Sequence, residues 1–365
     1  MTIPLVDLRA QQAEIAEDIA GPLSEAYANG HFIGGPEVEE FEREYASFIG
    51  ARHCIGVGNG TDALEFALRA VGVGHGDEVI VPANTFIATA EAVMRIGATP
   101  VLVDVDDEYL LIDPELAVAA ITERTRAVVP VHLFGQVAPV EKLAAAAEAG
   151  LAVVEDAAQA HGARRFGQAA GTLGAVAGTS FYPGKNLGAA GDAGAVTTND
   201  DDTAAKLRLL GAHGSRTKYV HEAVGFNSRL DTVQAIVLRA KLRRLAAWNR
   251  MRVAAAQRYS ELLAGSAVAT PRSAPGNEDV WHLYVVRVEE RDRVLARLNE
   301  AGIGAGIHYP TPLHLTEALS GLGRGRGDFP VSERAADQIL SLPIYPHLTA
   351  EQQDVVVEVL LDAVG

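Results

Sequence analysis

Short runs of apolar, often β-branched residues recur through the first two thirds of the chain. Each run is bounded by Gly, Pro or Asp, the pattern expected of parallel strands that are buried on both faces. The runs are residues 77–83, 99–105, 125–133 and 151–158. We expect these runs to be strands of one sheet.

Helical patterns lie between the apolar runs. In residues 61–73, four apolar side chains recur at i, i+3, i+4 and i+7 and would share one face of a helix. They are Leu64, Ala67, Leu68 and Val71. Residues 141–150 predict a second helix, which Gly150 would end. This alternation predicts a doubly wound α/β domain with helices on both faces of a mostly parallel sheet.

The pattern changes near residue 230. Residues 230–265 are helical in pattern but too long for one ordinary helix, so we expect a break that leads into a smaller domain. The boundaries that follow are 1–245 for a large domain and 246–365 for a small C-terminal domain. The elements expected in the small domain are strands at 280–288 and 303–310, helices at 291–302 and after residue 353, and a loop at 321–330.

Composition and charge narrow the class of protein. With 365 residues and 48% hydrophobic residues, the chain can bury a large core. The net charge of −16 argues against nucleic acid or an anionic membrane as partner, but allows a phosphorylated small molecule in a local basic pocket. The single cysteine, Cys54, excludes an intrachain disulfide, and no secretory signal or membrane span is evident. We expect a soluble, cytoplasmic protein.

An acidic pair ends the run at residues 151–158. Ligands of open α/β sheets bind beyond the carboxyl ends of the strands, so Asp156 is placed to face a site. The alternative is a helix N-cap, a position that Asp favours. Gln159 can reach the same pocket, whereas His161 fits a structural role equally well.

A glycine-rich turn, GVGNGTDALEFAL at residues 56–68, leads into a helix with Thr61 near its start. Small residues let the backbone approach a ligand, and a helix N-terminus favours a phosphate. The turn has neither the G-K-[ST] of a P-loop nor the glycine spacing of a dinucleotide fingerprint. Alone, it also fits an ordinary glycine turn with a threonine cap.

Lys185 lies between a Pro-Gly turn and a run of glycines, in SFYPGKNLGAAGDAGA at residues 180–195. A lysine that forms a Schiff base must react as a neutral amine and be held rigidly. Tight turns would hold it, and apolar surroundings would lower the pKa of its amine by desolvation. Ser180, on the preceding strand, could donate to a phosphate. Alone, Lys185 also fits a solvated turn lysine.

Together, the three elements match the needs of pyridoxal phosphate. The helix start would anchor its phosphate, the acid would keep its pyridine nitrogen protonated, and the lysine would hold its aldehyde as an imine and move the proton. Phe86 could stack on the ring or could be a core phenylalanine.

With these elements, the sequence resembles the DegT/DnrJ/EryC1/StrS aminotransferases, which act on nucleotide-linked keto sugars. The resemblance covers nearly the whole chain and is carried by nine motifs in order. They are GNGTDAL, DEVIVPANTFIATAEA, VVPVHLFGQ, VEDAAQAHGA, SFYPGKNLGAAGDAGA, FNSRLD, VWHLYVVRV, IHYPTPLHL and LSLPIYPHLT. The family implies an α/β fold of type I, like aspartate aminotransferase, and a homodimer with active sites at the subunit interface.

The resemblance also implies roles for individual residues. Lys185 would form the imine, and Asp156 would pair with the pyridine nitrogen. The residues that would bind the cofactor are Gly60, Thr61, Phe86, Gln159, Ser180 and, from the partner subunit, Asn227. Those that would face the sugar nucleotide are Tyr182, His308, Tyr309, Lys218 and Arg229. The loop at residues 213–229, which also holds His213 and Arg216, would supply positive charge for the diphosphate; for Arg216 and Lys218 a solvated loop is the alternative. No metal is implied.

The implied reaction is a transamination in two halves, in which L-glutamate gives its amino group to the cofactor and a keto sugar then takes it. The segment at residues 307–315 most resembles enzymes that aminate C3 of dTDP-3-keto-6-deoxyhexoses, while amination at C4 stays open. A related sugar dehydratase would have histidine in place of Lys185. A non-catalytic regulatory protein that binds pyridoxal phosphate on the same scaffold is a further alternative. A nicotinamide-dependent oxidoreductase would need a G-x-G-x-x-G fingerprint that this chain does not offer.

Overall fold

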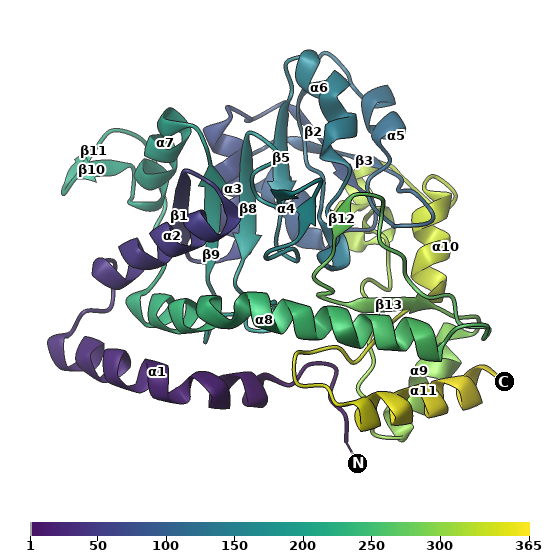
Figure 1. Ribbon diagram of the computed structural model, residues 1–365. Helices are drawn as coiled ribbons and strands as arrows, with labels where there is room; N and C mark the ends of the chain where they lie inside the picture. The colour runs from purple at the N-terminus through teal and green to yellow at the C-terminus, as the bar shows by residue number, and fades with distance from the viewer. Residues whose placement is uncertain (1) are drawn as a thin grey trace.

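The computed structural model describes residues 2–365 and has a central sheet of seven strands, in the order β1-β9-β8-β5-β4-β2-β3 (Figure 1). Neighbouring strands from β8 to β3 are parallel, and β9 is antiparallel to both of its neighbours. The strands are β1 (His53–Val57), β2 (Glu78–Pro82), β3 (Thr99–Val103), β4 (Thr125–Val128), β5 (Ala152–Asp156), β8 (Val176–Ser180) and β9 (Gly194–Thr198). The expectation of a mostly parallel sheet is confirmed.

Helices cover both faces of this sheet, as predicted. In β2, Val79 and Val81 belong to one core cluster and Ile80 to another, because successive side chains of a strand point to opposite faces. The first cluster includes side chains of α3 (Gly60–Ala70), α4 (Ile87–Arg95) and α7 (Asp201–Gly211). The second includes side chains of α5 (Pro114–Ala119), α6 (Ala144–Glu148) and the 3-10 turns η1 (Leu133–Gly135) and η2 (Val140–Leu143). Gly150, with φ +83°, follows α6 as expected.

One long helix, α8 (Thr232–Leu262), runs beneath the sheet as an unbroken element of 31 residues (Figure 1). The break expected within residues 230–265 is therefore wrong. No Gly or Pro interrupts residues 232–262, and buried side chains recur along the helix from Thr232 to Tyr259. Tertiary packing along its whole length thus stabilises a helix that local pattern alone would have divided. Two N-terminal helices, α1 (Leu8–Asn29) and α2 (Pro36–Ile49), pack against it.

The C-terminal part has a core of its own. It is built on the antiparallel pair β13 (Tyr284–Arg287) and β14 (Ile339–Leu342), with α9 (Arg291–Glu300) and α11 (Ala350–Val364) beside it. Tyr259 and Leu263, at the end of α8, belong to this core. The strand expected at 303–310 is wrong, because this segment forms only two isolated bridges, Ile303 with Ile3 and Gly306 with Ser341. A side chain at Gly304 would lie 2.7 Å from the backbone nitrogen of Leu5, so this segment instead packs against the N-terminal residues.

The predicted domain boundary at residue 245 falls inside α8 and stays a prediction. The loop expected at 321–330 joins η4 to α10. The remaining elements are β6 (Arg164–Arg165), β7 (Gln168–Ala169), β10 (Ser215–Thr217), β11 (Val220–His221), β12 (Asn277–Glu278), η3 (Leu313–Leu315), η4 (Glu317–Leu322) and α10 (Pro330–Gln338). Across residues 2–365, none of the helices combines the length and the apolar character that crossing a membrane would require.

The close approach of α3 to β8 gives a test of the fold. A Cβ on Gly178 would lie 2.9 Å from both the backbone nitrogen and Cδ2 of Leu64. Gly178→Ala should therefore destabilise the protein by about 1–3 kcal/mol, because α3 must move away from the sheet. Gly321→Ala is the matched control, since a Cβ there meets nothing within 4 Å, and it should change stability by less than about 0.5 kcal/mol. Chemical denaturation measures both, and equal stabilities would contradict this packing.

Candidate active site

A cavity of about 480 Å³ lies at the carboxyl ends of β5 and β8. Its lining combines both strand ends, the start of α3, the turn after β8 and a segment from the C-terminal part. Ten residues singled out from the sequence line it: Gly60, Thr61, Phe86, Asp156, Gln159, Ser180, Tyr182, Lys185, His308 and Tyr309. The fold therefore brings together residues that are up to about 250 positions apart in the chain.

Lys185 faces this cavity from a tight turn, in which its backbone N–H donates to the carbonyl of Tyr182 (2.9 Å). Its amine makes no hydrogen bond with any of residues 2–365. Burial lowers the pKa of the Lys185 amine to about 8, and the Asp156 carboxylate opposes that shift. A substantial fraction of the amine is thus neutral near pH 8, the form in which a lysine acts as nucleophile or base.

A second buried lysine supports the turn from behind. Lys241, on α8, donates from Nζ to the carbonyl of Gly188 (2.7 Å), three residues after Lys185. Burial lowers the pKa of Lys241 to about 8. No local pattern marks this contact, because Lys241 is one of several basic residues along α8.

Asp156 is the last residue of β5 and is held in place by two hydrogen bonds. Its Oδ2 accepts from Oγ1 of Thr89 (2.8 Å), and its Oδ1 accepts from the N–H of Ala158 (3.1 Å). The next element after Asp156 is the strand β6 and not a helix, so the N-cap alternative is wrong. Thr89, on α4, is a functional neighbour that the sequence analysis missed.

Gln159 joins the η1 turn to the C-terminal part of the chain. Its Oε1 accepts from the N–H of Phe134 (2.7 Å), and its Nε2 donates to the hydroxyl of Tyr309 (3.1 Å). Burial raises the pKa of Tyr309, and the Asp156 carboxylate adds to that effect, so the phenol stays protonated. The neighbouring His308 is fixed by a 2.8 Å hydrogen bond between its Nδ1 and Oγ of Ser341.

The start of α3 has the features of an anion site. Asn59, not Thr61, is the N-cap, and its side chain accepts from the N–H of Asp62 (2.8 Å). The N–H groups of Gly60 and Thr61 have no partner within residues 2–365. A Cβ on Gly60 would lie 2.5 Å from Cβ of Ser180, so only glycine lets the serine reach the helix start. Free N–H groups, a helix dipole and a serine hydroxyl suit a phosphate.

Two large aromatic side chains stand at the mouth of the cavity. Phe86 is 51% exposed and Tyr182 is 58% exposed, so the core alternative for Phe86 is wrong. The Phe86 ring lies 5.3 Å from that of Tyr309, at an interplanar angle of 36°. Aromatic rings placed this way can cover a planar ligand.

Other residues from the sequence analysis lie outside the cavity. Asn227 and Arg229 are exposed and bond to each other (2.9 Å), and Lys218 lies at the tip of the β10–β11 hairpin, which projects from the body of the chain (Figure 1). Arg216 pairs with Glu222 at 3.8 Å. The roles expected of these residues stay predictions. His161 is buried behind the site, where its Nε2 contacts Oγ1 of Thr179 (3.0 Å).

The cavity also has lining residues that the sequence analysis did not assign. Leu5 and Val6 reach it from the N-terminus, and no local pattern marks them. His282 reaches it from the C-terminal part, inside a motif that was noted only for its resemblance.

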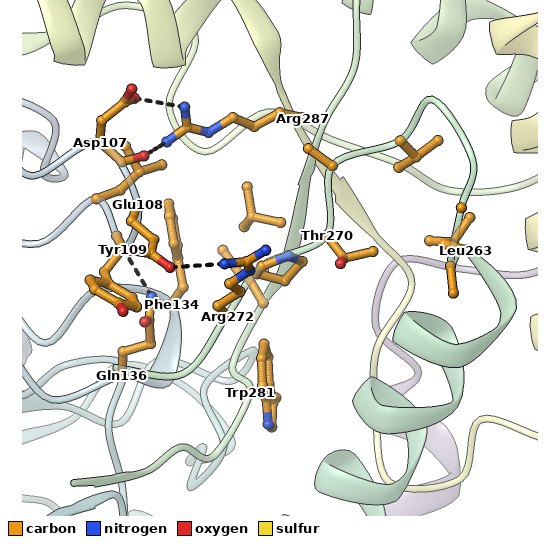
Figure 2. Close-up of a pocket in the computed structure, with 18 residues that line it drawn as sticks. Asp107, Glu108, Tyr109, Phe134, Gln136, Leu263, Thr270, Arg272, Trp281 and Arg287 are labelled. Carbon is orange, nitrogen blue, oxygen red and sulfur yellow. Dashed lines mark hydrogen bonds and ion pairs between the residues drawn. The ribbon is translucent and has the colours of Figure 1, made fainter. Parts of the chain in front are cut away.

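A second cavity, of about 500 Å³, lies between residues 107–110 and the segment from Leu263 to Arg287 (Figure 2). Its charged groups are already paired, Arg287 with Asp107 at 2.8 Å and Arg272 with Glu108 at 3.3 Å. Neither lysine nor histidine is among its lining residues. We therefore place the candidate active site in the first cavity, which Lys185 and Asp156 line.

The residues of the first cavity fit pyridoxal phosphate. They combine an unpaired lysine amine, a fixed carboxylate and an anion cradle, in a space of the size that small ligands occupy. This set defines an enzyme that uses pyridoxal phosphate and a lysine.

Comparison with known proteins gives the family. Residues 13–361 match the DegT/DnrJ/EryC1/StrS aminotransferase family, and the chain belongs to it. It is 49% identical over 362 residues to the "Erythromycin biosynthesis sensory transduction protein EryC1" of Saccharopolyspora erythraea, covering 99% of both chains. It is 47% identical over 352 residues to the "dTDP-3-amino-3,4,6-trideoxy-alpha-D-glucose transaminase" of Streptomyces venezuelae, covering 96% of this chain and 93% of the relative. A solved structure of S. venezuelae DesV matches with a TM-score of 0.96 and 46% identity, covering 99% of this chain and 98% of the other.

These findings confirm the fold type and the enzyme class. The protein is a sugar aminotransferase that depends on pyridoxal phosphate. When bound, the cofactor supplies a ring that accepts electrons from the bond being broken. The chain's own residues would hold its phosphate (Gly60, Thr61 and Ser180), its ring nitrogen (Asp156) and its aldehyde (Lys185).

Asp156→Asn should lower the steady-state rate by about a hundredfold or more, because a neutral amide does not hold a proton on the ring nitrogen. Thr89→Val is the matched control. It keeps the carboxylate and removes one hydrogen bond to it, so its loss should be about tenfold or less. Initial rates of glutamate-dependent transamination measure both. A normal rate in Asp156→Asn would show that another acid performs this role.

Proposed function

We propose that this protein transfers the amino group of L-glutamate to C3 of a dTDP-linked keto-6-deoxyhexose, as a homodimer with shared active sites. The observation that carries the proposal is the cavity itself. There, the free amine of Lys185 faces the same space as Asp156 and the anion cradle at the start of α3.

The names of the relatives support C3 as the position of amination. Five relatives at 43–48% identity have names that place the amino or keto group at C3 of the sugar, with dTDP sugars in three of them and UDP sugars in two. The dTDP names stand at 47%, 48% and 44% identity, against 44% and 43% for the UDP names. We therefore favour a dTDP sugar, with the C4 ketone as the alternative acceptor.

The openness of the cavity supports a shared site. Phe86 and Tyr182 expose about half of their side chains at its mouth, and a projecting hairpin carries Lys218 away from the body of the chain. The cavity lining of a single chain has no cation besides Lys185 to meet a diphosphate. A second copy that places Lys218 and Arg229 beside this mouth would supply that charge.

The defining experiment follows the visible absorbance of the protein loaded with pyridoxal phosphate. Excess L-glutamate should remove the band of the lysine-bound cofactor, and a dTDP-3-keto-6-deoxyhexose should restore it while an amino sugar forms. Restoration by the dTDP-4-keto or a UDP-3-keto sugar at a higher rate would change the proposed acceptor. A band that glutamate leaves intact would contradict the amino donor.

Mixed dimers test the shared site. Lys185→Ala removes the nucleophile, and Asn227→Ala removes the group proposed to reach the partner's cofactor phosphate. Each homodimer should be weak or inactive, whereas mixed dimers should recover activity, because one of their two sites would carry neither change. Separately tagged subunits and purification of the doubly tagged dimer give the measurement. Confirmed mixed dimers without recovery would contradict the shared geometry.

A second candidate is a regulatory protein that binds pyridoxal phosphate without turnover. Its support is the name of the 49% identical relative, a "sensory transduction protein", and that of a 46% identical "Pleiotropic regulatory protein". The complete set of Lys185, Asp156 and the phosphate cradle favours the enzyme. The glutamate experiment separates the two, since a non-catalytic protein would keep its visible band.

A further inference from the structure

A chain of buried amide side chains lies directly behind the Lys185 turn. Nδ2 of Asn186 donates to Oδ1 of Asn249 (3.0 Å) and to the carbonyl of Val280 (2.9 Å). Nδ2 of Asn249 donates to the carbonyl of His161 (2.8 Å). A backbone carbonyl can only accept, so the two carbonyls fix which atom of each amide is the donor.

This chain of bonds decides where His282 carries its hydrogen. Nδ1 of His282 lies 3.2 Å from Oδ1 of Asn186, an oxygen that can only accept, so Nδ1 is the protonated nitrogen. Burial, with further effects from Lys185 and Arg252, holds the pKa of His282 well below its ordinary value. The ring is therefore neutral, and Nε2 has a free lone pair.

His282 lines the cavity that holds Lys185. Its Nε2 has no hydrogen-bond partner within residues 2–365, but it is not one of the fully buried polar atoms that lack a partner. Nδ1 of His161, by contrast, is fully buried and has no partner within these residues. An acceptor and a lysine amine, each without a partner in the described chain, thus face one space.

Several other titratable groups surround the Lys185 amine. The pKa of His308 is lowered by burial and further by Lys185, so this ring also stays neutral. Its Nδ1 is already bonded to Ser341. The remaining titratable groups that line the cavity are Asp156, Tyr182, Asp192 and Tyr309. His282 is the histidine here whose hydrogen position is fixed by amides that are themselves fixed by backbone carbonyls.

We propose that His282 is a positioning residue for Lys185, whose amine donates a hydrogen bond to Nε2 of His282 while the cofactor carries the amino group. This inference rests on the proposed function, in which the lysine is free while the cofactor carries the amino group. A four-carbon side chain is flexible, and a fixed acceptor would hold its amine at one location between the two halves of the reaction. The bond also favours the charged amine, and so opposes the effect of burial.

The test uses the return half-reaction, which needs no sugar. Holoenzyme converted with L-glutamate and freed of excess is mixed with 2-oxoglutarate, and recovery of the visible band is followed between about pH 6 and pH 10. In this step the amino group moves to 2-oxoglutarate, which becomes glutamate, and the aldehyde form is regenerated. Lys185 must be neutral to act as base, so the rate rises with pH and its midpoint reports the pKa of the lysine.

Two substitutions separate positioning from a purely structural role. His282→Asn can keep the hydrogen bond to Asn186 but is too short to reach the cavity. His282→Gln places an amide oxygen near the position of Nε2. We expect the Asn variant to shift the midpoint down by about one pH unit, because the charged amine loses its acceptor, and the Gln variant to restore most of that shift.

The opposite order, with Asn like the wild type and Gln impaired, would show that His282 serves only Asn186 and would overturn the proposal. An unchanged midpoint in both variants would also overturn it. If the Asn variant does not fold, the Nε2 resonance of His282 in ¹⁵N-histidine-labelled wild-type protein should move when glutamate frees Lys185, and a fixed resonance would overturn the proposal. A wild-type protein whose band does not respond to glutamate at all would instead overturn the amino-donor proposal, and the inference with it.

Discussion

The close packing of α3 on β8 is the contact on which the site depends. Gly178 lets Leu64 of the helix approach the strand, and Gly60 lets the helix start approach Ser180. Because the strand ends at Ser180, the chain turns there, and Lys185 enters the cavity five residues later. One backbone-to-backbone approach therefore sets the position of the phosphate cradle and of the reactive lysine together, before any ligand is present.

The site is completed by a polar face of α8, a helix whose sequence pattern predicts helical structure but none of these contacts. Lys241 bonds to Gly188 and Asn249 to the carbonyl of His161, while Asn186 bonds to Asn249. Nη1 of Arg252 donates to the carbonyls of Trp281 (3.2 Å) and Ile344 (3.0 Å). Buried polar groups of this kind stabilise one arrangement when they are satisfied, because any other arrangement leaves them without partners.

The parts of the structure that were predictable have local causes. Apolar runs gave the parallel strands, and the strand ends at Asp156 and Ser180 followed from them. The resemblance added His308 and Tyr309, which no spacing argument would have placed beside Lys185. Thr89, Lys241 and His282 could not be found locally, since their roles come from contacts 53–96 residues away in the chain. The break expected in α8 and the strand expected at 303–310 are both wrong, because packing against distant segments determines the conformation of these residues.

The polar face of α8 constrains how sequences with this fold can vary in length. Lys241 and Arg252 are about three turns apart, so both face the same side of the helix. One residue inserted between them would rotate everything beyond it by about 100° and turn Arg252 away from its carbonyls. Surface loops tolerate insertions at little thermodynamic cost, whereas this interval is fixed by helical phase. The number of residues between Lys241 and Arg252 therefore matters as much for the support of the Lys185 turn as the identity of those residues.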